Sequence, residues 1–450
     1  MSFYTLLVAQ VFFPLQEALK SHSTLAVRRG MDDSQWWSAE KIEALRLDRL
    51  RRLLSSAGSD VPYYRNLFSR IGFCPAKITA TSDLARLPLL TKAIIRAEGE
   101  RMKSQVGRDL ARFNTGGSSG EPLIFFIGKE RISHDVAAKW RATRWWGVDI
   151  GDPEIVVWGS PIELGAQDRL RMLRDKVMRT ELLPAFEMSD ARLDGFVDRI
   201  RVRRPHMLFG YPSAISLIVG HARKRGIALD KLGVKVVFVT SERLYDHQRE
   251  VISKAFGCPV ANGYGGRDAG FIAHECPAGG MHITAEDIIV EIVSTQGEVL
   301  PPGSPGEIVV THLATADFPF VRYRTGDIGT IGIESCTCGR GLPLLREIEG
   351  RSTDFLVAAD GTVMHGLALI YILRDLPGID AFRIVQESLE SVLVQIVPTV
   401  DYEPTLESRI DAGIKARLGQ TVAVRIERLL EIPRDKSGKY RYVQSLVAAS

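Results

Sequence analysis

Four apolar, β-branched stretches in the middle of the chain alternate with segments whose apolar residues recur at helical spacing. The stretches are EIVVWGS (154–160), HMLFGYP (206–212), VKVVFVTSE (234–242) and PVANGYGG (259–266). Strands that alternate with helices are typical of βαβ units, in which each helix crosses over between parallel strands. The pattern therefore predicts an α/β fold built on a largely parallel sheet.

The two ends of the chain have different patterns. Residues 39–56 place Ile and Leu among Lys, Arg and Glu at helical spacing, which predicts an amphipathic helix in an N-terminal helical cap. After residue 280, short apolar runs between Gly and Pro, such as DIIVEIV and GEIVVTHL, predict antiparallel strands or a small barrel. Further on, short strands and two helical stretches, Gly366 to Leu376 and Thr405 to Leu418, predict a small α+β domain.

Length and composition are those of a multidomain globular protein. The chain has 450 residues, of which 45% are hydrophobic and 25% charged. We predict a large N-terminal domain at 1–353, with a helical cap at 1–105, and a small C-terminal domain at 354–450. A net charge of +4 does not indicate nucleic-acid binding. The basic run RIRVRR (199–204) is interpreted as a solvated helix face, with an anion-binding patch as the alternative. Five cysteines are typical of a reducing compartment, so we expect a cytoplasmic protein.

The N-terminal sequence MSFYTLLVAQVFFPLQEALK begins apolar without a basic segment before the apolar run. No stretch reaches the ~20 apolar residues that a membrane span requires. The segment Tyr4 to Leu15 could lie on a membrane or a partner protein as an amphipathic helix. We favour packing on the body of the protein.

Residues 114–122, NTGGSSGEP, form a loop almost without bulky side chains. A Gly/Ser-rich turn can wrap a phosphate, because backbone N–H groups reach the oxygens where no Cβ intervenes. The Walker pattern is excluded, since Glu121 and Pro122 follow Gly120 where Lys and Ser or Thr would be needed. On this stretch alone, a surface hairpin is an equally good interpretation.

Four further motifs decide between these interpretations. NGYGGRD (262–268), YRTGD (323–327), GRSTD (350–354) and PRDKSGK (433–439) follow the loop in that order. Together they resemble the adenylate-forming superfamily of acyl-CoA ligases, peptide-synthetase adenylation domains and luciferases, over roughly residues 110 to 441.

A closer likeness is to the phenylacetate–CoA ligase family. It is carried by VPYYRNLF (61–68), LPLLTK (87–92) and CTCGR (336–340). Within that family, FFPLQEALKSHSTL and SQWWSAEKIEAL look most like a branch associated with capsular polysaccharide genes.

The resemblance implies a fold and a reaction. The N-terminal domain would combine α/β sheets with a small β-barrel-like region, and the C-terminal domain would be a mobile lid. A carboxylic acid, aromatic or otherwise, would attack MgATP to give an acyl-adenylate, which then passes to coenzyme A. Other acceptors stay open: a carrier protein, an amine or a hydroxyl. An inactive nucleotide-binding scaffold is the alternative of another class.

Residue roles follow from the same resemblance. The loop residues would hold the β- and γ-phosphates: Thr115, Gly116, Gly117, Ser118, Ser119 and Gly120. Tyr264, flanked by Gly263 and Gly265, would pack on the adenine or line the acyl pocket. Asp268 would bind Mg²⁺, although the family usually has Glu there; its alternative role is to cap a following helix. Mg²⁺ requires near-octahedral oxygens at ~2.1 Å, which a shorter acid meets only by a shifted backbone or through water.

Later motifs contain the residues expected to bind the ribose, to form the hinge and to contact the reacting phosphorus. Asp327 would accept hydrogen bonds from the ribose hydroxyls, and Arg351 would help to hold the ribose and phosphates. Asp354 occupies the position of the hinge. Lys439 matches the lysine of the adenylating step, where an ammonium stabilises the negative charge that builds on the pentavalent phosphorus.

The acyl pocket is expected around Phe209, Tyr211 and Pro212. Ser241 and Glu242, at the strand end before the adenine-binding turn, would border both the nucleotide and this pocket. The resemblance also makes a homodimer an expectation. Contact of the N-terminus with a membrane or with polysaccharide-assembly proteins stays the alternative to its packing on the body of the protein.

Three cysteines, two of them within CTCGR, and a histidine could form a closed metal site. The candidates are Cys276, His282, Cys336 and Cys338, which suit tetrahedral Zn²⁺, and His274 could replace His282. Free buried thiols are the alternative. Cys74 and Cys258 are expected to be inert core residues.

Overall fold

The computed structural model describes residues 2–114, 123–158, 169–185, 190–351, 355–359, 363–365, 367–374, 376–432 and 443–447. The chain divides into two compact units, which we treat separately. Unit 1 comprises Met1–Thr325 and Gly329–Ile348, and unit 2 comprises Gly326–Ile328 and Glu349–Ser450. The predicted domain boundary and hinge at Asp354 lies outside the described residues.

Unit 1 begins with helices. They are α1 (Phe3–Leu7), a π-helical segment (Val8–Phe12), α2 (Phe13–Leu19), α3 (Thr24–Ser34), α4 (Ala39–Asp60), α5 (Pro62–Ile71) and α6 (Lys92–Glu98). Pro62 opens α5, where its missing N–H costs no helical hydrogen bond, and Gly72 ends it in the left-handed conformation. The predicted amphipathic helix is α4, whose buried side chains are all apolar.

The large sheet of unit 1 has the strand order β4-β3-β5-β6-β7-β8-β9 in the described residues. The strands are β3 (Glu154–Trp158), β4 (Thr180–Pro184), β5 (Met207–Gly210), β6 (Val236–Thr240), β7 (Val260–Gly266), β8 (Gly270–Glu275) and β9 (Met281–Ile283). The pairs from β4 to β7 are parallel, and β8 and β9 add antiparallel strands at the other edge. The four predicted strands and the parallel sheet are confirmed, whereas β4 was not predicted.

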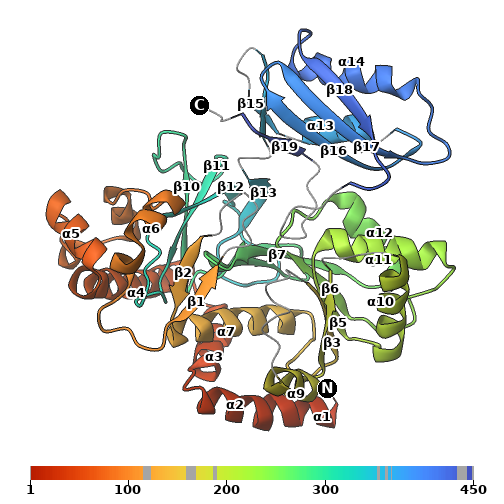
Figure 1. Cartoon of the computed structure of the whole chain (residues 1–450). Helices are drawn as coiled ribbons and strands as arrows, with labels where there is room; N and C mark the ends of the chain where they lie inside the picture. The colour runs from red at the N-terminus through yellow and green to blue at the C-terminus, as the bar shows by residue number, and fades with distance from the viewer. Residues whose placement is uncertain are drawn as a thin grey trace. The chain divides into compact units, whose positions relative to one another are not determined.

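Helices cover both faces of this sheet (Figure 1). They are α7 (Lys129–Trp145) on one face and α10 (Asp190–Arg203), α11 (Pro212–Lys224) and α12 (Asp246–Phe256) on the other, with α9 (Arg169–Met178) leading into β4. Alternate strand residues enter the two cores: Leu208 and Val237 pack with α10–α12, and Phe209 and Phe238 pack on the α7 side. Burial on both faces accounts for the continuous apolar runs in the sequence.

Two further sheets lie largely in unit 1. The strand β1 (Ala111–Asn114) pairs antiparallel with β2 (Ile124–Ile127), and a second sheet has the order β10-β11-β12-β13. Its strands are β10 (Ile288–Val293), β11 (Gly306–His312), β12 (Tyr323–Ile331) and β13 (Leu345–Arg351). The predicted antiparallel β structure after residue 280 is confirmed by the β10–β11 pairing, which joins Val290 to Val310.

Unit 2 contains a sheet of order β18-β17-β16-β19 and a short hairpin, β14-β15. The elements are β14 (Phe355–Val357), β15 (Val363–His365), α13 (Leu367–Arg374), β16 (Ile379–Ser388), β17 (Ser391–Pro398), α14 (Leu406–Leu418), β18 (Ala423–Arg428) and β19 (Val443–Ser445). The buried side chains of α14, Leu406, Ile410, Ile414 and Leu418, recur every four residues. The expected α+β composition of this part is thus present.

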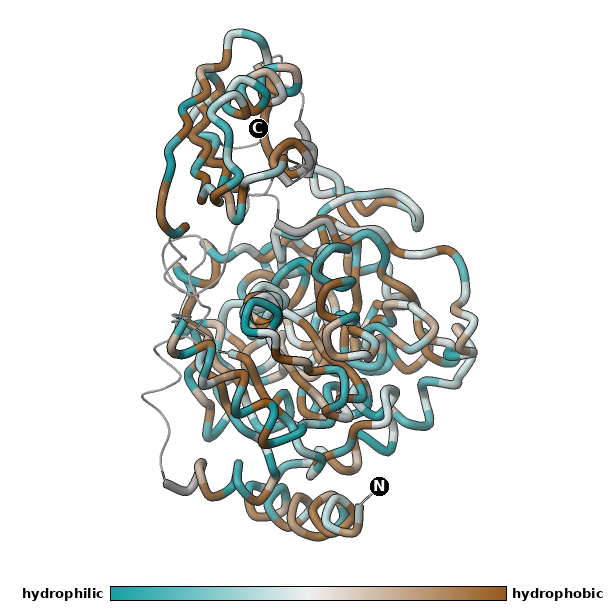
Figure 2. Tube along the Cα trace, turned by 90° about the vertical axis from the view of Figure 1, so that its right-hand side faces the viewer, coloured by the Kyte–Doolittle hydropathy of each residue, from teal (hydrophilic) through white to brown (hydrophobic). Residues whose placement is uncertain are grey.

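Among the described helices, none combines the length and the apolar character that crossing a bilayer requires. Figure 2 shows brown, hydrophobic positions along the N-terminal helices at one end of unit 1.

Candidate functional site

The carboxyl ends of three parallel strands bring several predicted residues to one edge of the large sheet. Thr240, the last residue of β6, pairs with Gly263 of β7, and β5 runs beside β6 up to Gly210. Ser241 follows directly with φ +69°, a left-handed conformation that is uncommon for serine. In open α/β sheets, ligands bind outside the carboxyl ends of the strands.

Glu242 connects two of the predicted segments. Its Oε2 accepts a hydrogen bond from the backbone N–H of Ser213 (3.2 Å) in the first turn of α11, which begins at Pro212. A carboxylate is favoured at a helix N-terminus, where unpaired N–H groups point outward. The segments around Tyr211 and Ser241 are therefore held together at the sheet edge.

Aromatic rings are stacked beside this edge. Trp158, at the end of β3, stacks on Tyr211 with ring centroids 4.5 Å apart and also lies 6.1 Å from the ring of Phe209. Phe209 in turn lies 5.8 Å from Phe238. All three predicted pocket residues, Phe209, Tyr211 and Pro212, are buried. Trp158 was not predicted, although it stands in the quoted stretch EIVVWGS.

Asp268 lies in the turn between β7 and β8, and its carboxylate is fixed by two hydrogen bonds. The Tyr323 hydroxyl donates to Oδ2 (2.6 Å), and the backbone N–H of Ala269 donates to Oδ1 (3.1 Å). The strand β8 follows at Gly270, so the alternative role of Asp268 as a helix cap is wrong. Because a carboxylate offers about four lone-pair sites, these two bonds leave capacity for a cation.

The motifs NGYGGRD and YRTGD meet at a second point. The hydroxyls of Tyr264 on β7 and Thr325 on β12 lie 3.5 Å apart, and the Thr325 hydroxyl donates to the carbonyl of Ile308 (2.8 Å). Gly263 packs so closely that a Cβ there would lie 2.7 Å from the ring of Phe238. Glycine is therefore required beside Tyr264.

A buried arginine of α7 holds the turn that carries Asp268. The Nη2 of Arg131 donates to the backbone carbonyls of Arg267 (3.4 Å) and Asp268 (3.3 Å), and its Nε donates to Asp135 (2.8 Å). Burial acts to raise the pKa of Asp135, but the charges and hydrogen bonds of Arg131 and His312 together outweigh it, and the pKa is lowered. Sequence reasoning missed Arg131, because nothing in the local pattern distinguishes it from a surface arginine.

His312 of β11 closes this buried network. Its Nε2 lies 3.6 Å from Asp135, and its pKa is lowered to about 4, first by burial and then by the charge of Arg131. Gly270, at φ +85°, leaves room for this arrangement, since a Cβ there would lie 2.8 Å from the His312 ring. The Asp268 turn is thus supported by a neutral imidazole and a compensated ion pair.

Some predicted site residues lie outside the described residues, and two others are placed only by their strand. The phosphate loop Thr115–Gly120, the hinge Asp354 and the catalytic Lys439 lie outside the described residues. Asp327 lies on β12, and Arg351 is the last residue of β13.

The four proposed metal ligands come together. The ligand atoms of Cys276, His282, Cys336 and Cys338 all lie within 4.8 Å of one another. The Sγ atoms of Cys276 and Cys336 are 3.6 Å apart, and Cys338 Sγ lies 3.2 Å from His282 Nε2. A disulfide would need ~2.05 Å, whereas Zn–S bonds of ~2.3 Å in a tetrahedron place sulfurs about 3.8 Å apart.

The backbone around the cluster fits it closely. His282 Nδ1 lies 3.2 Å from the carbonyl of Leu342, which leaves Nε2 facing the cysteines. Gly280 lies so close that a Cβ would be 2.6 Å from Cys336 Sγ. His274, the alternative ligand, pairs with His282 across β8 and β9 but is not part of the cluster.

The cluster also borders the N-terminal helices. Arg340, two residues after Cys338, lies over the rings of Trp36 and Trp145, and its Nε donates to Gln35 Oε1 (3.0 Å). Trp145 donates to the same oxygen (2.8 Å). These contacts fix the cysteine turn against the end of α3 and α7.

The remaining cysteines differ from each other. Cys258 is buried, and burial raises the pKa of its thiol to about 11. Cys74 is exposed, so the prediction of a core residue was wrong there. The neighbouring Phe73 takes the buried position instead.

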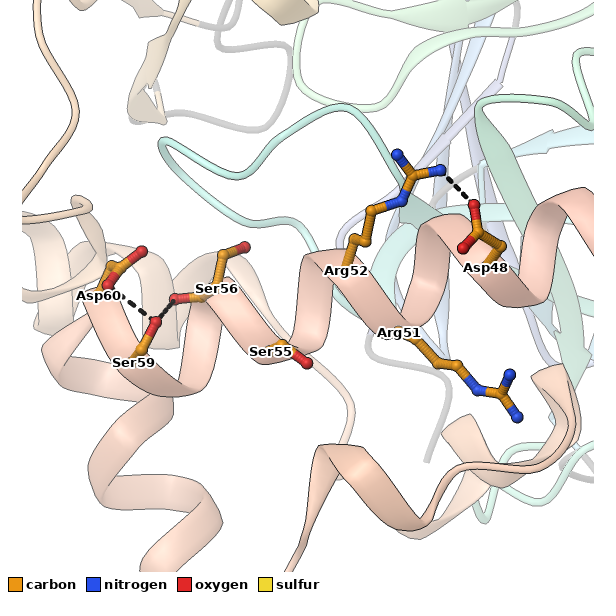
Figure 3. A pocket seen from close by; sticks show the side chains of 7 residues that line it. All are labelled: Asp48, Arg51, Arg52, Ser55, Ser56, Ser59 and Asp60. Atoms are coloured by element: carbon orange, nitrogen blue, oxygen red, sulfur yellow. Dashed lines mark hydrogen bonds and ion pairs between the residues drawn. The ribbon is translucent and has the colours of Figure 1, made fainter.

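A shallow hollow lies along α4, away from these groups (Figure 3). Its polar side chains interact largely within the helix, as in the Arg52–Asp48 ion pair. Its lining residues are Asp48, Arg51, Arg52, Ser55, Ser56, Ser59 and Asp60, none of which was predicted to be functional.

Comparison with known proteins gives relatives over most of the chain. Residues 356–445 match the family described as the CapK C-terminal domain. The chain is 23% identical to the protein CapK of Staphylococcus aureus over 391 residues, covering 84% of each chain. It is 26% identical to a phenylacetate-coenzyme A ligase of Thermus thermophilus over 442 residues, covering 90% of this chain and 97% of the relative.

Solved structures show the same fold. A crystal structure of 2-hydroxyisobutyryl-CoA ligase in the postadenylation state, in complex with R3-HIB-AMP, matches with a TM-score of 0.75 at 20% identity. The match covers 92% of this chain and 91% of that one. The predicted architecture, a large α/β N-terminal part with a smaller C-terminal part, is confirmed, as is the resemblance on which it was based.

Proposed function

From the relationship of this chain to CapK and the phenylacetate–coenzyme A ligases, we propose that it activates a carboxylic acid with ATP and transfers the acyl group to coenzyme A. Relatives of that name and a structural neighbour named as a CoA ligase support the ligase class. Nothing in those names identifies the acid that this chain uses.

The observation that carries the proposal is the hydrogen bond between Tyr323 and Asp268. It joins the first residue of YRTGD to the last residue of NGYGGRD, which are 55 residues apart in the sequence. The start of one motif and the end of another, both expected to surround one nucleotide, thus lie side by side in unit 1. The sheet edge with Ser241, Gly263 and Tyr264 is continuous with this point, because Tyr264 also contacts Thr325.

The first half-reaction needs charge compensation. A carboxylate oxygen attacks the α-phosphorus of ATP, a new P–O bond forms, and the bond to pyrophosphate breaks. Asp268 would hold the Mg²⁺ that neutralises the phosphates, and its orientation is set by Tyr323 and by Arg131 behind the turn. The role of Lys439 at the reacting phosphorus rests on the resemblance.

In the second half-reaction the thiol of coenzyme A loses its proton and its sulfur attacks the acyl carbon. A C–S bond forms and the bond to AMP breaks. A hinge at Asp354 and a turning C-terminal lid belong to this proposal, as does the pocket formed by Phe209, Tyr211 and Pro212. The stacked rings of Phe209, which is buried, and Trp158, which is partly buried, favour a small or planar acyl group.

The proposal is tested by pyrophosphate release with MgATP over aryl, fatty and amino acids. We expect one class of acid to stimulate release, and Lys439→Ala to reduce the rate by at least about a hundredfold, because one lost transition-state charge contact costs that much. Lys436→Ala removes a charge from the same motif and should retain most of the activity.

The acceptor is identified by mass spectrometry of the products after coenzyme A is added. A thioester of coenzyme A supports the full proposal, whereas an adenylate that coenzyme A does not consume would replace it with another acceptor. Absence of pyrophosphate release with every acid, while ATP still binds, would overturn the adenylation step and favour the scaffold.

A further inference from the structure

The N-terminal helices carry an apolar row on the side that does not face the protein. Phe3, Leu7, Val11, Leu15 and Leu19 follow one another at intervals of four residues. Leu15 and Leu19 are 58% and 81% exposed, and Phe3 is 82% exposed. We call these five residues the outer row; Leu6 and Phe12, also exposed, flank it.

The opposite side of the same helices packs against the body of unit 1. The Thr5 hydroxyl donates to Asp152 (2.8 Å), Phe13 packs edge-on against Trp140, and Val8 fills the space beside Gly151. Glu17 is buried and accepts a hydrogen bond from Thr24. The outer row is therefore not displaced core: the segment is anchored on one side and presents the other.

A π-helical turn keeps the row straight. In a regular α-helix, a spacing of four residues drifts by about 40° at each step. The wider turn at Val8–Phe12 compensates for this drift, so the buried side chains Thr5, Ala9, Phe13 and Glu17 also stay in line.

A second exposed segment adjoins the first. The Tyr4 hydroxyl donates to the carbonyl of Val177 in α9 (2.8 Å), and Arg179 lies over the Tyr4 ring. Figure 1 accordingly shows α1 beside α9 at one end of unit 1. Within α9, Met172 and Leu173 are exposed, and the sequence RLRMLRDKVM has four basic residues against one acid.

The charges around the outer row favour one kind of partner. The sole acidic residue between positions 2 and 20, Glu17, is buried, while Lys20 is exposed. In α9, Asp175 is paired with Arg174, and Lys176 is exposed. An apolar row flanked by basic side chains is typical of helices that lie in the interface of anionic membranes. A second copy of the chain would instead bring like charges together across a symmetric contact.

We propose that the outer row of α1–α2, together with α9, binds the surface of an anionic lipid bilayer without crossing it. The inference is independent of the reaction proposed above. It places unit 1 at a membrane, where the segment lies parallel to the surface and the apolar side chains enter the headgroup region.

The full chain is tested by flotation with vesicles of phosphatidylcholine, with and without phosphatidylglycerol. We expect binding to the anionic vesicles only, and weakening in high salt, because the basic side chains are screened. The double variant L15D/L19D should bind at least about tenfold more weakly, since two apolar contacts are lost. Val202→Asp, at a residue 80% exposed on α10, is the matched control and should bind like the native chain.

Circular dichroism shows whether each variant is folded, and light scattering shows whether it self-associates. Failure of the native chain to float with anionic vesicles would overturn the proposal, as would equal binding by a folded L15D/L19D variant. Self-association that L15D/L19D abolishes, without vesicle binding by the native chain, would assign the outer row to a second copy instead. Lys176→Glu, which leaves the apolar row intact, should reduce binding at low salt.

Discussion

The hydroxyl of Tyr323 sets the orientation of the neighbouring Asp268 carboxylate. Its Oη donates to Asp268 Oδ2 at 2.6 Å, and Tyr323 itself is fully buried. Hydrogen bonds to charged groups contribute about 1.5–3 kcal/mol. An aspartate that is shorter than the usual glutamate is thereby held in one orientation.

We expect Tyr323→Phe to raise the Mg²⁺ concentration needed for half-maximal pyrophosphate release about tenfold, because the carboxylate loses its orienting donor while the ring volume is kept. A Mg²⁺ titration of the initial rate measures this. Tyr402→Phe, which removes the hydrogen bond to Glu407 in unit 2, serves as the control. An unchanged Mg²⁺ requirement in an active Tyr323→Phe enzyme would contradict the role given to Asp268.

The cysteine cluster brings together segments that are distant in the sequence. The turn after Cys276 and the turn containing Cys336 and Cys338 meet beside Gln35 of the N-terminal part. Three thiolates and an imidazole provide a closed tetrahedral set for Zn²⁺, without an open position for catalysis.

We expect the purified protein to contain about one zinc per chain and Cys336→Ser to lose it. The variant should unfold about 5 °C or more below the native chain, since a bound metal stabilises the folded state. Metal analysis and thermal unfolding provide the readouts, and Cys74→Ser, at an exposed thiol, is the control. Metal-free native protein that unfolds at the same temperature as Cys336→Ser would rule out this site.

Elements were easier to predict than the contacts between them. Apolar runs predicted β3, β5, β6 and β7, because strands covered on both faces have continuous hydrophobic sequences. The short strand β4 has no such run and was missed. The bonds of Arg131 and Tyr323 to the Asp268 turn span 137 and 55 residues, and no local pattern indicates which side chains a fold brings together over such separations.

At the scale of the whole molecule, buried histidines make stability depend on pH. The pKa values of His274 and His312 are lowered to about 3 and about 4, in both cases mainly by burial. In the unfolded chain the same groups take up protons near pH 6.5. Between pH 6.5 and 4 the unfolded state therefore binds more protons, and stability falls as the pH is lowered.

His134 makes stability depend on pH in the opposite direction. Burial alone would lower its pKa, but Asp287, 2.7 Å away, outweighs this and raises it. The stabilisation from His134 is complete below pH 6.5 and is lost as the pH rises through the raised pKa.

We expect the free energy of unfolding of unit 1 to decrease from pH 6.5 to 4, and His274→Phe to reduce the slope by about one proton. Urea unfolding followed by tryptophan fluorescence measures unit 1 specifically, because all six tryptophans belong to it. A slope that His274→Phe leaves unaltered, with cooperative unfolding retained, would contradict the assignment.

The wide turn at Val8–Phe12 also determines where the N-terminal segment can change its length. A regular α-helix needs seven residues, not eight, to return to nearly the same side after two turns. Deletion of one exposed residue in this turn, such as Gln10, would therefore produce an ordinary helix with Thr5 and Phe13 still directed inward. Related chains that are one residue shorter in this segment are expected to lack that residue here, where the deletion leaves both faces of the helix in place.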